Sequence, residues 1–501
     1  MTDTQSDTHR DQSDGDETFD VFKPGTSEVV GTWPVHGPEH VRATTDAARV
    51  AAAWWSSLTF KERRKRLDRF KAVLATRSEE LGRLVADETG KPTGDAFLEI
   101  ALALGHIAWV GKHAGRVLGP QRTKSSLMSP HLSGEVSYRP FGVVGVIGPW
   151  NFPVFTPLGA IVSALAAGNT VVFKPSELTP GVGAWLVDAF AQVVPEHPVL
   201  QLVTGHGQTG AALVRSGVDK VAFTGSTATA KKVMAVCAES LTPMVAECGG
   251  KDALIVDEDA DLDAAAEGAA WGALMNAGQA CIGTERILVH ERVYADFLAK
   301  LSAQVQDVRA GSGEGAKIGP MTLPSQVGVV EEHVADALSR GAQLVLGGPA
   351  THGDVVQPTI LAGVPSDALA NQEETFGPTM TVQSVADMDE AVRLANGTSY
   401  GLAAVVYAGA QGRRIARRLR TGMVSVNAVF ATAELPSSPF GGIGDSGFGR
   451  VHGEDGLREF ASPQSVVHQR FPALFALTTF QRTKRTEDLL RTVVKAVYGR
   501  S

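Results

Sequence analysis

Residues 141–173 read FGVVGVIGPWNFPVFTPLGAIVSALAAGNTVVF, and they decide the fold because they contain no charged side chain. By length alone, such a run could cross a membrane. Gly148-Pro149, Pro153 and Pro157 interrupt it, however, and Gly168-Asn169 is a turn signal, so a single spanning helix is not expected. The pattern predicts, in order, a buried strand (Val143 to Ile147), a helix (about Leu158 to Ala167) and a second buried strand (Thr170 to Phe173).

Short apolar runs continue to alternate with helical patterns on both sides of Gly250. Continuous apolar strands are typical of a parallel sheet covered on both faces, and repeated βαβ units favour a doubly wound nucleotide-binding domain. The predicted fold class is α/β, with a Rossmann-like domain followed by a second α/β domain. The main further strands are expected at Val199 to Val203, Lys220 to Phe223, Ala253 to Val256, Arg286 to Val289 and Gly401 to Tyr407.

Composition excludes several classes of protein. A chain of 501 residues is too long for one core, so we expect two or more domains. The net charge is −8, which argues against a nucleic-acid partner. The cysteines are Cys237, Cys248 and Cys281, too few for a disulfide framework and without a C-x-x-C pair for zinc, so no metal site is expected. A reducing cytoplasm fits this usage, and the polar N-terminus does not resemble a signal peptide.

Two motifs indicate covalent catalysis. Cys281 lies in Asn276-Ala277-Gly278-Gln279-Ala280-Cys281-Ile282-Gly283, and Glu247 lies in Val245-Ala246-Glu247-Cys248-Gly249-Gly250-Lys251. A thiolate presented by a loop of small residues can act as a nucleophile, and a carboxylate in a glycine-rich turn can accept a proton. The competing interpretation is a buried structural cysteine and a solvated glutamate, which is the common case for a lone cysteine.

A third motif, Pro149-Trp150-Asn151-Phe152-Pro153, weakens that competing interpretation. Together the three motifs resemble the aldehyde dehydrogenase superfamily, from about Phe22 to about Val467. The resemblance implies that Cys281 attacks an aldehyde, and that the Asn151 amide and the Cys281 N–H stabilise the oxyanion. It also implies that Glu247 activates the water that hydrolyses the thioester, which separates a hydrolytic enzyme from a coenzyme-A-acylating one.

The expected cofactor is NAD, with NADP possible. The resemblance gives Lys174 and Glu177 the adenosine ribose hydroxyls, and a carboxylate there disfavours the 2′-phosphate of NADP. Trp150 is also expected to contact the cofactor, and Glu374 and Phe376 match the element that holds the nicotinamide ribose.

The phosphates are expected at Gly225 and Ser226, where a strand ends and a helix begins. Gly205-His206-Gly207-Gln208-Thr209-Gly210 also matches a dinucleotide fingerprint, but the pattern alone is weak, and we do not assign the phosphates to it.

The chain departs from the usual family residues at two positions. Cys248 stands where the family usually has Leu, and we interpret it as a small apolar substitute packed inside, with a regulatory disulfide as the alternative. Ala230 stands where the family usually has Gly and adds a methyl group to the helix that faces the cofactor.

The resemblance also implies a small β arm for oligomerisation, as a homodimer or homotetramer. The resemblance and the sequence patterns together predict five parts: a disordered tail, an NAD-binding domain, a catalytic domain, the arm and an amphipathic extension. Their bounds are 1–19 for the tail, 20–117 and 141–247 for the NAD-binding domain, 248–443 for the catalytic domain, 118–140 and 462–475 for the arm, and 476–501 for the extension.

The substrate is expected to be a medium to bulky apolar or aromatic aldehyde. Phe155, Thr156 and Gly159 match positions that line the family's aldehyde tunnel, and Ile282 follows the nucleophile. Since no matching position is an arginine that would pair with a carboxylate, succinic semialdehyde is the second choice. A non-catalytic paralogue on the same fold is a further alternative, but it would lose the thiol, the amide or the base, and all three are present.

The C-terminus extends beyond the resemblance and ends in a predicted amphipathic helix. Its apolar face comprises Leu489, Leu490, Val493, Val494 and Val497, with Arg491 and Lys495 on the other side and Gly499 at the end. A basic amphipathic helix can lie on a membrane surface, but we expect this face to pack on its own subunit or on a neighbour.

Overall fold

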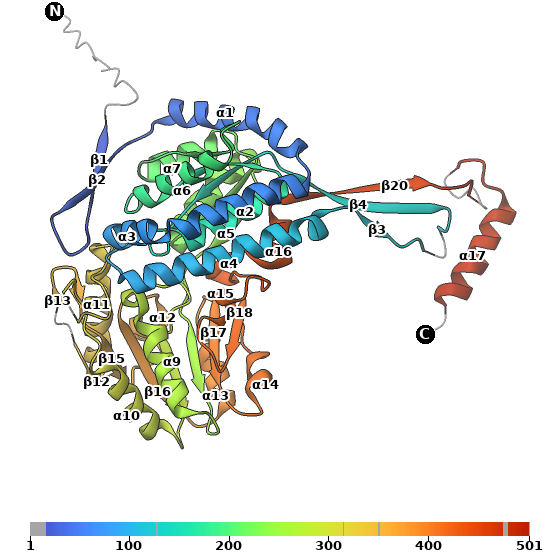
Figure 1. Ribbon diagram of the computed structural model, residues 1–501. Helices are drawn as coiled ribbons and strands as arrows, with labels where there is room; N and C mark the ends of the chain where they lie inside the picture. The colour runs from blue at the N-terminus through green and yellow to red at the C-terminus, as the bar shows by residue number, and fades with distance from the viewer. Residues whose placement is uncertain (1–16, 127–128, 314, 349–350, 474–478, 500–501) are drawn as a thin grey trace, which may run out of the picture.

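Two parallel-stranded sheets, each covered by helices, stack one above the other, and a narrow third sheet projects from the upper one (Figure 1). This is a computed structural model, and it describes residues 17–126, 129–313, 315–348, 351–473 and 479–499. The predicted α/β class, with two α/β units and a small β element, is confirmed.

The first sheet contains the two strands of the uncharged stretch 141–173, and its strand order is β19-β9-β8-β5-β6-β7. Its strands are parallel except for β19, which pairs antiparallel with β9. The strand bounds are β5 Val143–Ile147, β6 Thr170–Lys174, β7 Leu200–Leu202, β8 Lys220–Thr224, β9 Met244–Glu247 and β19 Gly447–Phe448. The helices of this unit are α1 Pro38–Ser57, α2 Phe60–Thr76, α3 Ser78–Thr89, α4 Thr93–Leu118, α5 Phe155–Ala167, α6 Pro180–Val193, α7 Gly207–Arg215, α8 Thr227–Ser240 and α16 Gly453–Glu459.

The second sheet has the order β12-β15-β16-β11-β10-β17-β18, with only the edge strand β12 antiparallel. Its strands are β10 Ala253–Val256, β11 Arg286–His290, β12 Gln343–Leu346, β15 Thr359–Ala362, β16 Thr379–Val385, β17 Ala403–Tyr407 and β18 Met423–Val426. Its helices are α9 Leu262–Leu274, α10 Tyr294–Val305, α11 Ser325–Ser339, α12 Leu369–Gln372, α13 Met388–Ala395, α14 Gly412–Ala416 and α15 Ala431–Glu434, with the 3₁₀ turns η1 Met275–Gly278 and η2 Gly444–Ser446. The short hairpin β13 Thr351–His352 and β14 Val355–Val356 completes this unit.

The helix predicted from Leu158 begins earlier, at Phe155, because of a contact that the local sequence does not contain. The carboxylate of Glu99, on α4, accepts hydrogen bonds from the backbone N–H groups of Val154 and Phe155. These N–H groups have no partner within their own helix, and a carboxylate also stabilises the positive end of the helix dipole.

The helix α4 is the one described helix whose length and composition would suit a membrane span. Of its most apolar window, 44% is buried inside the protein. Its apolar residues pack against α2, α3 and α5.

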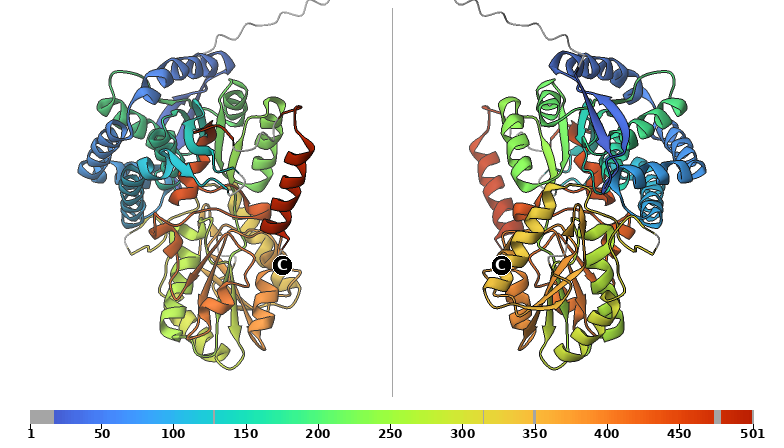
Figure 2. Two further views of the ribbon diagram at one scale, coloured as in Figure 1. Left: turned by 90° about the vertical axis from the view of Figure 1, so that its right-hand side faces the viewer. Right: turned by 90° about the vertical axis from the view of Figure 1, so that its left-hand side faces the viewer.

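The third sheet, the arm, joins distant parts of the chain. It pairs β20 Ala461–Gln469 with β4 Leu132–Pro140, and β4 with β3 Gln121–Thr123. Figure 1 shows it reaching away from the body, and the left view of Figure 2 looks along it.

The C-terminal helix α17 (Lys484–Tyr498) lies at the far end of the arm, and Gly499 ends it as predicted. None of its residues is buried, so the prediction that its apolar face packs on its own subunit is wrong for the described chain. Packing on a neighbour stays a prediction. The arm carries the helix away from the body, which the sequence pattern of the helix does not encode.

The predicted disordered tail, 1–19, lies outside the described residues as far as residue 16. Its last residues, Thr18 and Phe19, belong instead to β1 (Thr18–Phe22), which pairs with β2 (Val29–Pro34). Pairing with a later segment gives these residues the partners that a tail would lack.

Candidate active site

Two cavities meet at Cys281 and Glu247, which line both. The first, about 610 Å³, lies where β8 and β9 end, and we call it the strand-end cavity. Its walls include Trp150, Asn151, Thr224, Gly225, Ser226, Cys248, Gly249, Leu323, Gln326, Glu374 and Phe376. The second, about 680 Å³, is the apolar cavity. Its walls include Asp95, Leu98, Glu99, Leu102, Phe152, Phe155, Thr156, Trp271, Met275, Ile282, Phe430, Ala433, Glu434, Phe440, Val451 and His452.

A sharp turn after α9 presents Cys281. Asn276, Ala277 and Gly278 have φ values of 52°, 55° and 74°, a left-handed conformation that side chains disfavour. At Gly278 a Cβ would also overlap the carbonyl of Gly377, so only glycine fits. The run of small residues in this motif therefore lets the chain reverse, and the Cys281 side chain emerges partly exposed between the cavities.

Glu247 is the last residue of β9 and is 4% exposed. Burial raises the pKa of its carboxyl to about 7, although hydrogen bonds with the Cys281 thiol and with Thr224 oppose the rise. Its Oε1 atom has no hydrogen-bond partner among the described residues. Burial, together with the negative charge of Glu247, raises the pKa of Cys281 well above its usual range. The site thus pairs a neutral thiol with a carboxyl group that titrates near neutral pH.

Asn151 lies in the loop after β5 and is 6% exposed. Its side-chain Nδ2 donates to the carbonyl of Gln279 at 3.0 Å, which ties it to the loop of Cys281. An amide nitrogen carries two hydrogens, so one stays available to a ligand.

Several of the residues expected to bind the cofactor line the strand-end cavity. Trp150 and Phe376 meet edge to face with ring centroids 5.6 Å apart. Ser226 caps α8, its hydroxyl accepting from the N–H of Thr229, and Gly225 precedes it. Glu374 accepts the N–H of Gly250 at 3.1 Å, and burial raises the pKa of its carboxyl to about 8.

Lys174 and Glu177 are near each other, with 3.9 Å between Lys174 Nζ and Glu177 Oε2, but they do not line this cavity. Lys174 is buried and donates to the carbonyl of Pro175 at 2.9 Å. Residues 205–210, which match the weak fingerprint, form the start of α7 and line neither cavity.

The apolar cavity contains residues that sequence reasoning missed. Phe155, Thr156 and Ile282 line it as expected, whereas Gly159 lies behind the wall, against His452. No motif marks the contributions of α4, Trp271 and the aromatic residues near β18. The apolar pattern of α4 was the available signal, but nothing in it says which cavity the helix faces.

The acidic and basic side chains that line the apolar cavity do not balance: it has Asp and Glu residues but no Lys or Arg among its described lining. Asp95 and Glu434 lie in its wall. Burial, with the neighbouring His106, lowers the pKa of His452 well below its usual range, so this imidazole is neutral. The wall offers no cation to a carboxylate.

Cys248 is 2% exposed and packs in the core beside Phe223 and Ala246. Burial raises the pKa of its thiol to about 12. All three cysteines are free, and Cys237 is buried in α8.

The comparisons with known proteins agree with one another. Residues 10–466 match the model of the aldehyde dehydrogenase family. The chain is 36% identical to a 4,4′-diapolycopene aldehyde oxidase of Methylomonas sp., covering 90% of this chain and 86% of that protein. It is also 36% identical to a succinate-semialdehyde dehydrogenase [NADP(+)] of Escherichia coli strain K12, covering 89% and 93%. An NAD-dependent aldehyde dehydrogenase structure from Sinorhizobium meliloti superposes with a TM-score of 0.87 at 34% identity, covering 92% and 93%. The chain belongs to the aldehyde dehydrogenase family.

Proposed function

We propose that this protein oxidises a medium to bulky apolar or aromatic aldehyde to its carboxylic acid, with NAD as the preferred cofactor. The observation that carries the proposal is that Cys281 and Glu247 stand in the wall shared by the two cavities. An aldehyde in the apolar cavity and a nicotinamide in the strand-end cavity would then meet at the thiol.

In the proposed chemistry, the Cys281 sulfur attacks the carbonyl carbon and its proton passes to Glu247, which hydrogen-bonds the thiol. The second N–H of the Asn151 amide and the Cys281 N–H stabilise the oxyanion of the thiohemiacetal. As the oxyanion collapses, the carbon loses a hydride, which bound NAD would accept, and a thioester to Cys281 remains. Glu247, after releasing its proton, deprotonates a water that attacks the thioester carbon; the Cys281 thiolate leaves and the acid is released.

The strand-end cavity suits a dinucleotide. It opens at the carboxyl ends of parallel strands and at the start of α8, where free backbone N–H groups favour an anion. Gly225 and Ser226 would face the phosphates. Trp150, Glu374 and Phe376 would hold the nicotinamide end.

Lys174 and Glu177 would bind the adenosine ribose, outside the strand-end cavity. The carboxylate of Glu177, whose side chain is 44% exposed, would repel a 2′-phosphate. This is the reason to propose NAD over NADP.

The substrate class follows from the walls of the apolar cavity. Its aromatic residues include Phe155, Trp271 and Phe430, and the last two meet edge to face at 4.9 Å. A carboxylate tail would lie near Asp95 and Glu434 without a cation, which disfavours succinic semialdehyde. Semialdehyde oxidation stays the second candidate because a relative bears that name.

We also propose the division of labour among the parts of the chain. Residues 20–117 and 141–247 would bind the cofactor, 248–443 would supply the nucleophile, and the arm would join copies into a homo-oligomer. The exposed fractions of Val466 and Val467 on β20, 50% and 61%, favour such a contact. A reducing cytoplasm would keep the Cys281 thiol free.

The test is a panel of aldehydes assayed with NAD and with NADP. Benzaldehyde, a long-chain alkanal and succinic semialdehyde would be followed by reduced cofactor and by acid product, with and without coenzyme A. The proposal expects the apolar aldehydes to have the higher kcat/KM and the free acid to form without coenzyme A. Preference for succinic semialdehyde would favour the second candidate, and an acyl-coenzyme A product would overturn hydrolysis.

A further inference from the structure

A fully buried ion pair lies beside the candidate active site and belongs to none of the motifs. Lys91 Nζ and Glu99 Oε2 are 2.9 Å apart, and both side chains are 0% exposed. Removing two charges from water is costly, and a buried pair persists only where further hydrogen bonds satisfy it. Those further bonds identify what the pair holds.

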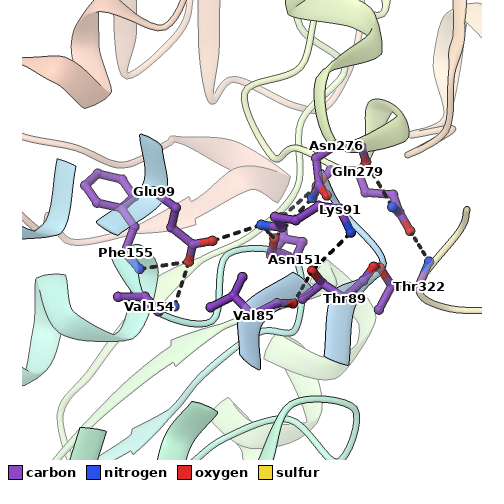
Figure 3. A network of polar contacts seen from close by, with 10 residues as sticks. All are labelled: Val85, Thr89, Lys91, Glu99, Asn151, Val154, Phe155, Asn276, Gln279 and Thr322. Carbon is purple, nitrogen blue, oxygen red and sulfur yellow. Dashed lines mark hydrogen bonds and ion pairs between the residues drawn. The ribbon is translucent and has the colours of Figure 1, made fainter. Parts of the chain in front are cut away.

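Each charged group forms hydrogen bonds with one end of the loop that carries Asn151. Lys91 Nζ donates to the backbone carbonyl of Asn151 at 2.6 Å, and its ammonium lies 4.3 Å from the centroid of the Phe152 ring. Glu99 Oε1 accepts the N–H groups of Val154 and Phe155 at 2.6 and 3.0 Å. The ion pair therefore brackets residues 151–155, from Asn151 to the start of α5 (Figure 3).

The same carbonyl links this loop to the loop of Cys281. Asn276 Nδ2 donates to the Asn151 carbonyl at 3.1 Å and to the Gln279 carbonyl at 3.2 Å. Asn151 Nδ2 donates to that Gln279 carbonyl at 3.0 Å, and Gln279 Oε1 accepts the N–H of Thr322 at 2.8 Å. Figure 3 shows these groups converging from several segments. Both the backbone and the amide of Asn151 are thus fixed relative to the thiol loop.

We propose that Lys91 and Glu99 are positioning residues that fix the Asn151 amide for the oxyanion. This inference rests on the proposed function, in which Asn151 stabilises the thiohemiacetal. Glu99 lies in the wall of the apolar cavity, but its side chain is 0% exposed and its carboxylate is held by Lys91, Val154 and Phe155. Lys91 and Glu99 therefore act through Asn151 and not on the substrate directly, so their removal has no separate effect once the amide is absent.

The first experiment is a double-mutant cycle. Lys91→Met/Glu99→Gln removes both charges together, so neither is left buried alone. With benzaldehyde and NAD, we expect kcat to fall about 10- to 100-fold, as for a small misplacement of a catalytic group, with the Kd of NAD unchanged. Asn151→Ala should lower kcat about 10²–10³-fold, and adding the two other changes to it should lower kcat no further. Multiplying effects would overturn the inference.

A matched control separates positioning from stability. Glu88, 2% exposed, accepts the N–H groups of Gly181 and Val182 at 2.8 and 2.9 Å, at the start of α6. It makes the same kind of contact as Glu99 but none of its hydrogen bonds reaches Asn151. Glu88→Gln is expected to shift Tm while kcat stays within about twofold of the wild type. An equal loss of kcat in this control would mean that the ion pair affects kcat only by stabilising the fold, and would overturn the inference.

A crystal structure of Lys91→Met/Glu99→Gln tests the inference without turnover. The Asn151 amide should leave the carbonyl of Gln279 while the Cys281 loop keeps its backbone. An Asn151 side chain in its original place would overturn the inference even if the wild type oxidised aldehydes as proposed. A wild type that oxidises no aldehyde in the panel would overturn the proposed function instead.

Discussion

The two cavities on either side of Cys281 differ in how the chain builds them. The strand-end cavity comes mainly from turns that directly follow β5, β8 and β9, so most of its residues lie in short motifs. Later segments add Leu323, Gln326, Glu374 and Phe376. The apolar cavity comes from α4, α9 and α15 and from loops far apart in the sequence. A candidate cofactor site can therefore be recognised from short stretches of sequence, whereas the shape of a substrate cavity depends on how distant segments pack. The predictions below test this contrast, from the largest effect to the smallest.

Cys281→Ala should have the largest effect, because it should remove turnover and leave NAD binding unchanged. In the proposed mechanism the thiol forms the covalent intermediate, so we expect turnover to fall by more than about 10⁴-fold while NAD still binds. Steady-state assay and titration of NAD binding by calorimetry check both halves. Substantial remaining oxidation by the pure variant would contradict the assignment and point to Cys248.

Glu247→Gln tests the carboxyl group that the cavities share. We expect steady-state turnover to fall about 10²–10⁴-fold, because in the proposed mechanism the attacking water loses its base. If Glu247 serves only hydrolysis, a burst of about one equivalent of reduced NAD per site survives. Rapid mixing with mass spectrometry of the Cys281 adduct measures this. A slowed burst assigns thiol activation to Glu247 as well, and unchanged turnover removes it from the mechanism.

The raised pKa of Glu247, about 7, makes both rate and stability depend on pH. If Glu247 is the base, as proposed, it must be ionised, so kcat should rise as pH passes about 7. Between its ordinary pKa of about 4.5 and about 7, the folded protein binds more protons at this group than the unfolded chain does, so its contribution to stability falls as pH rises. From pH 5 to pH 8, Glu247→Gln should therefore gain about 2.5 kcal/mol of unfolding free energy relative to the wild type.

Denaturant unfolding of both proteins at the two pH values measures that difference. Taking the difference cancels the contribution of Glu88, whose pKa is also raised by burial. It cancels only part of the contribution of Glu374, because the charge of Glu247 helps to raise the pKa of that carboxyl. A difference independent of pH would show that the pKa of Glu247 is not raised in solution.

Glu177→Ser should relax the preference for NAD. Two unit charges about 4 Å apart near a surface interact by up to about 4 kcal/mol before screening, and the partial exposure of Glu177 reduces this, so we expect about a tenfold change. The ratio of kcat/KM with NADP to that with NAD is the measurement. An unchanged ratio would remove Glu177 from cofactor choice.

Trp271→Ala should affect only the apolar cavity. Losing the ring, which packs on Phe430, should lower kcat/KM for benzaldehyde by about tenfold and leave kcat/KM for acetaldehyde within about threefold. The Kd of NAD should not change. Equal losses for both aldehydes would mean that the ring does not contact the substrate.

The sequence alone determined the features whose conformation depends on neighbouring residues. The uncharged stretch before Lys174 predicted β5 and β6 because buried parallel strands require continuous apolar runs. The small residues before Cys281 indicated a loop, and glycine at position 278 readily adopts the left-handed conformation found there. Such features depend on neighbours within a few positions, so they are readable without the fold.

Only the tertiary structure decided how distant segments meet. Glu99 sets the start of α5 from another helix, Lys91 reaches the Asn151 carbonyl, and α17 stands off the body at the end of the arm. The wall of the apolar cavity is likewise assembled from several elements. The physical reason is that apolar periodicity says which face of a helix is buried but not against what, because packing and buried ion pairs depend on contacts across the whole chain.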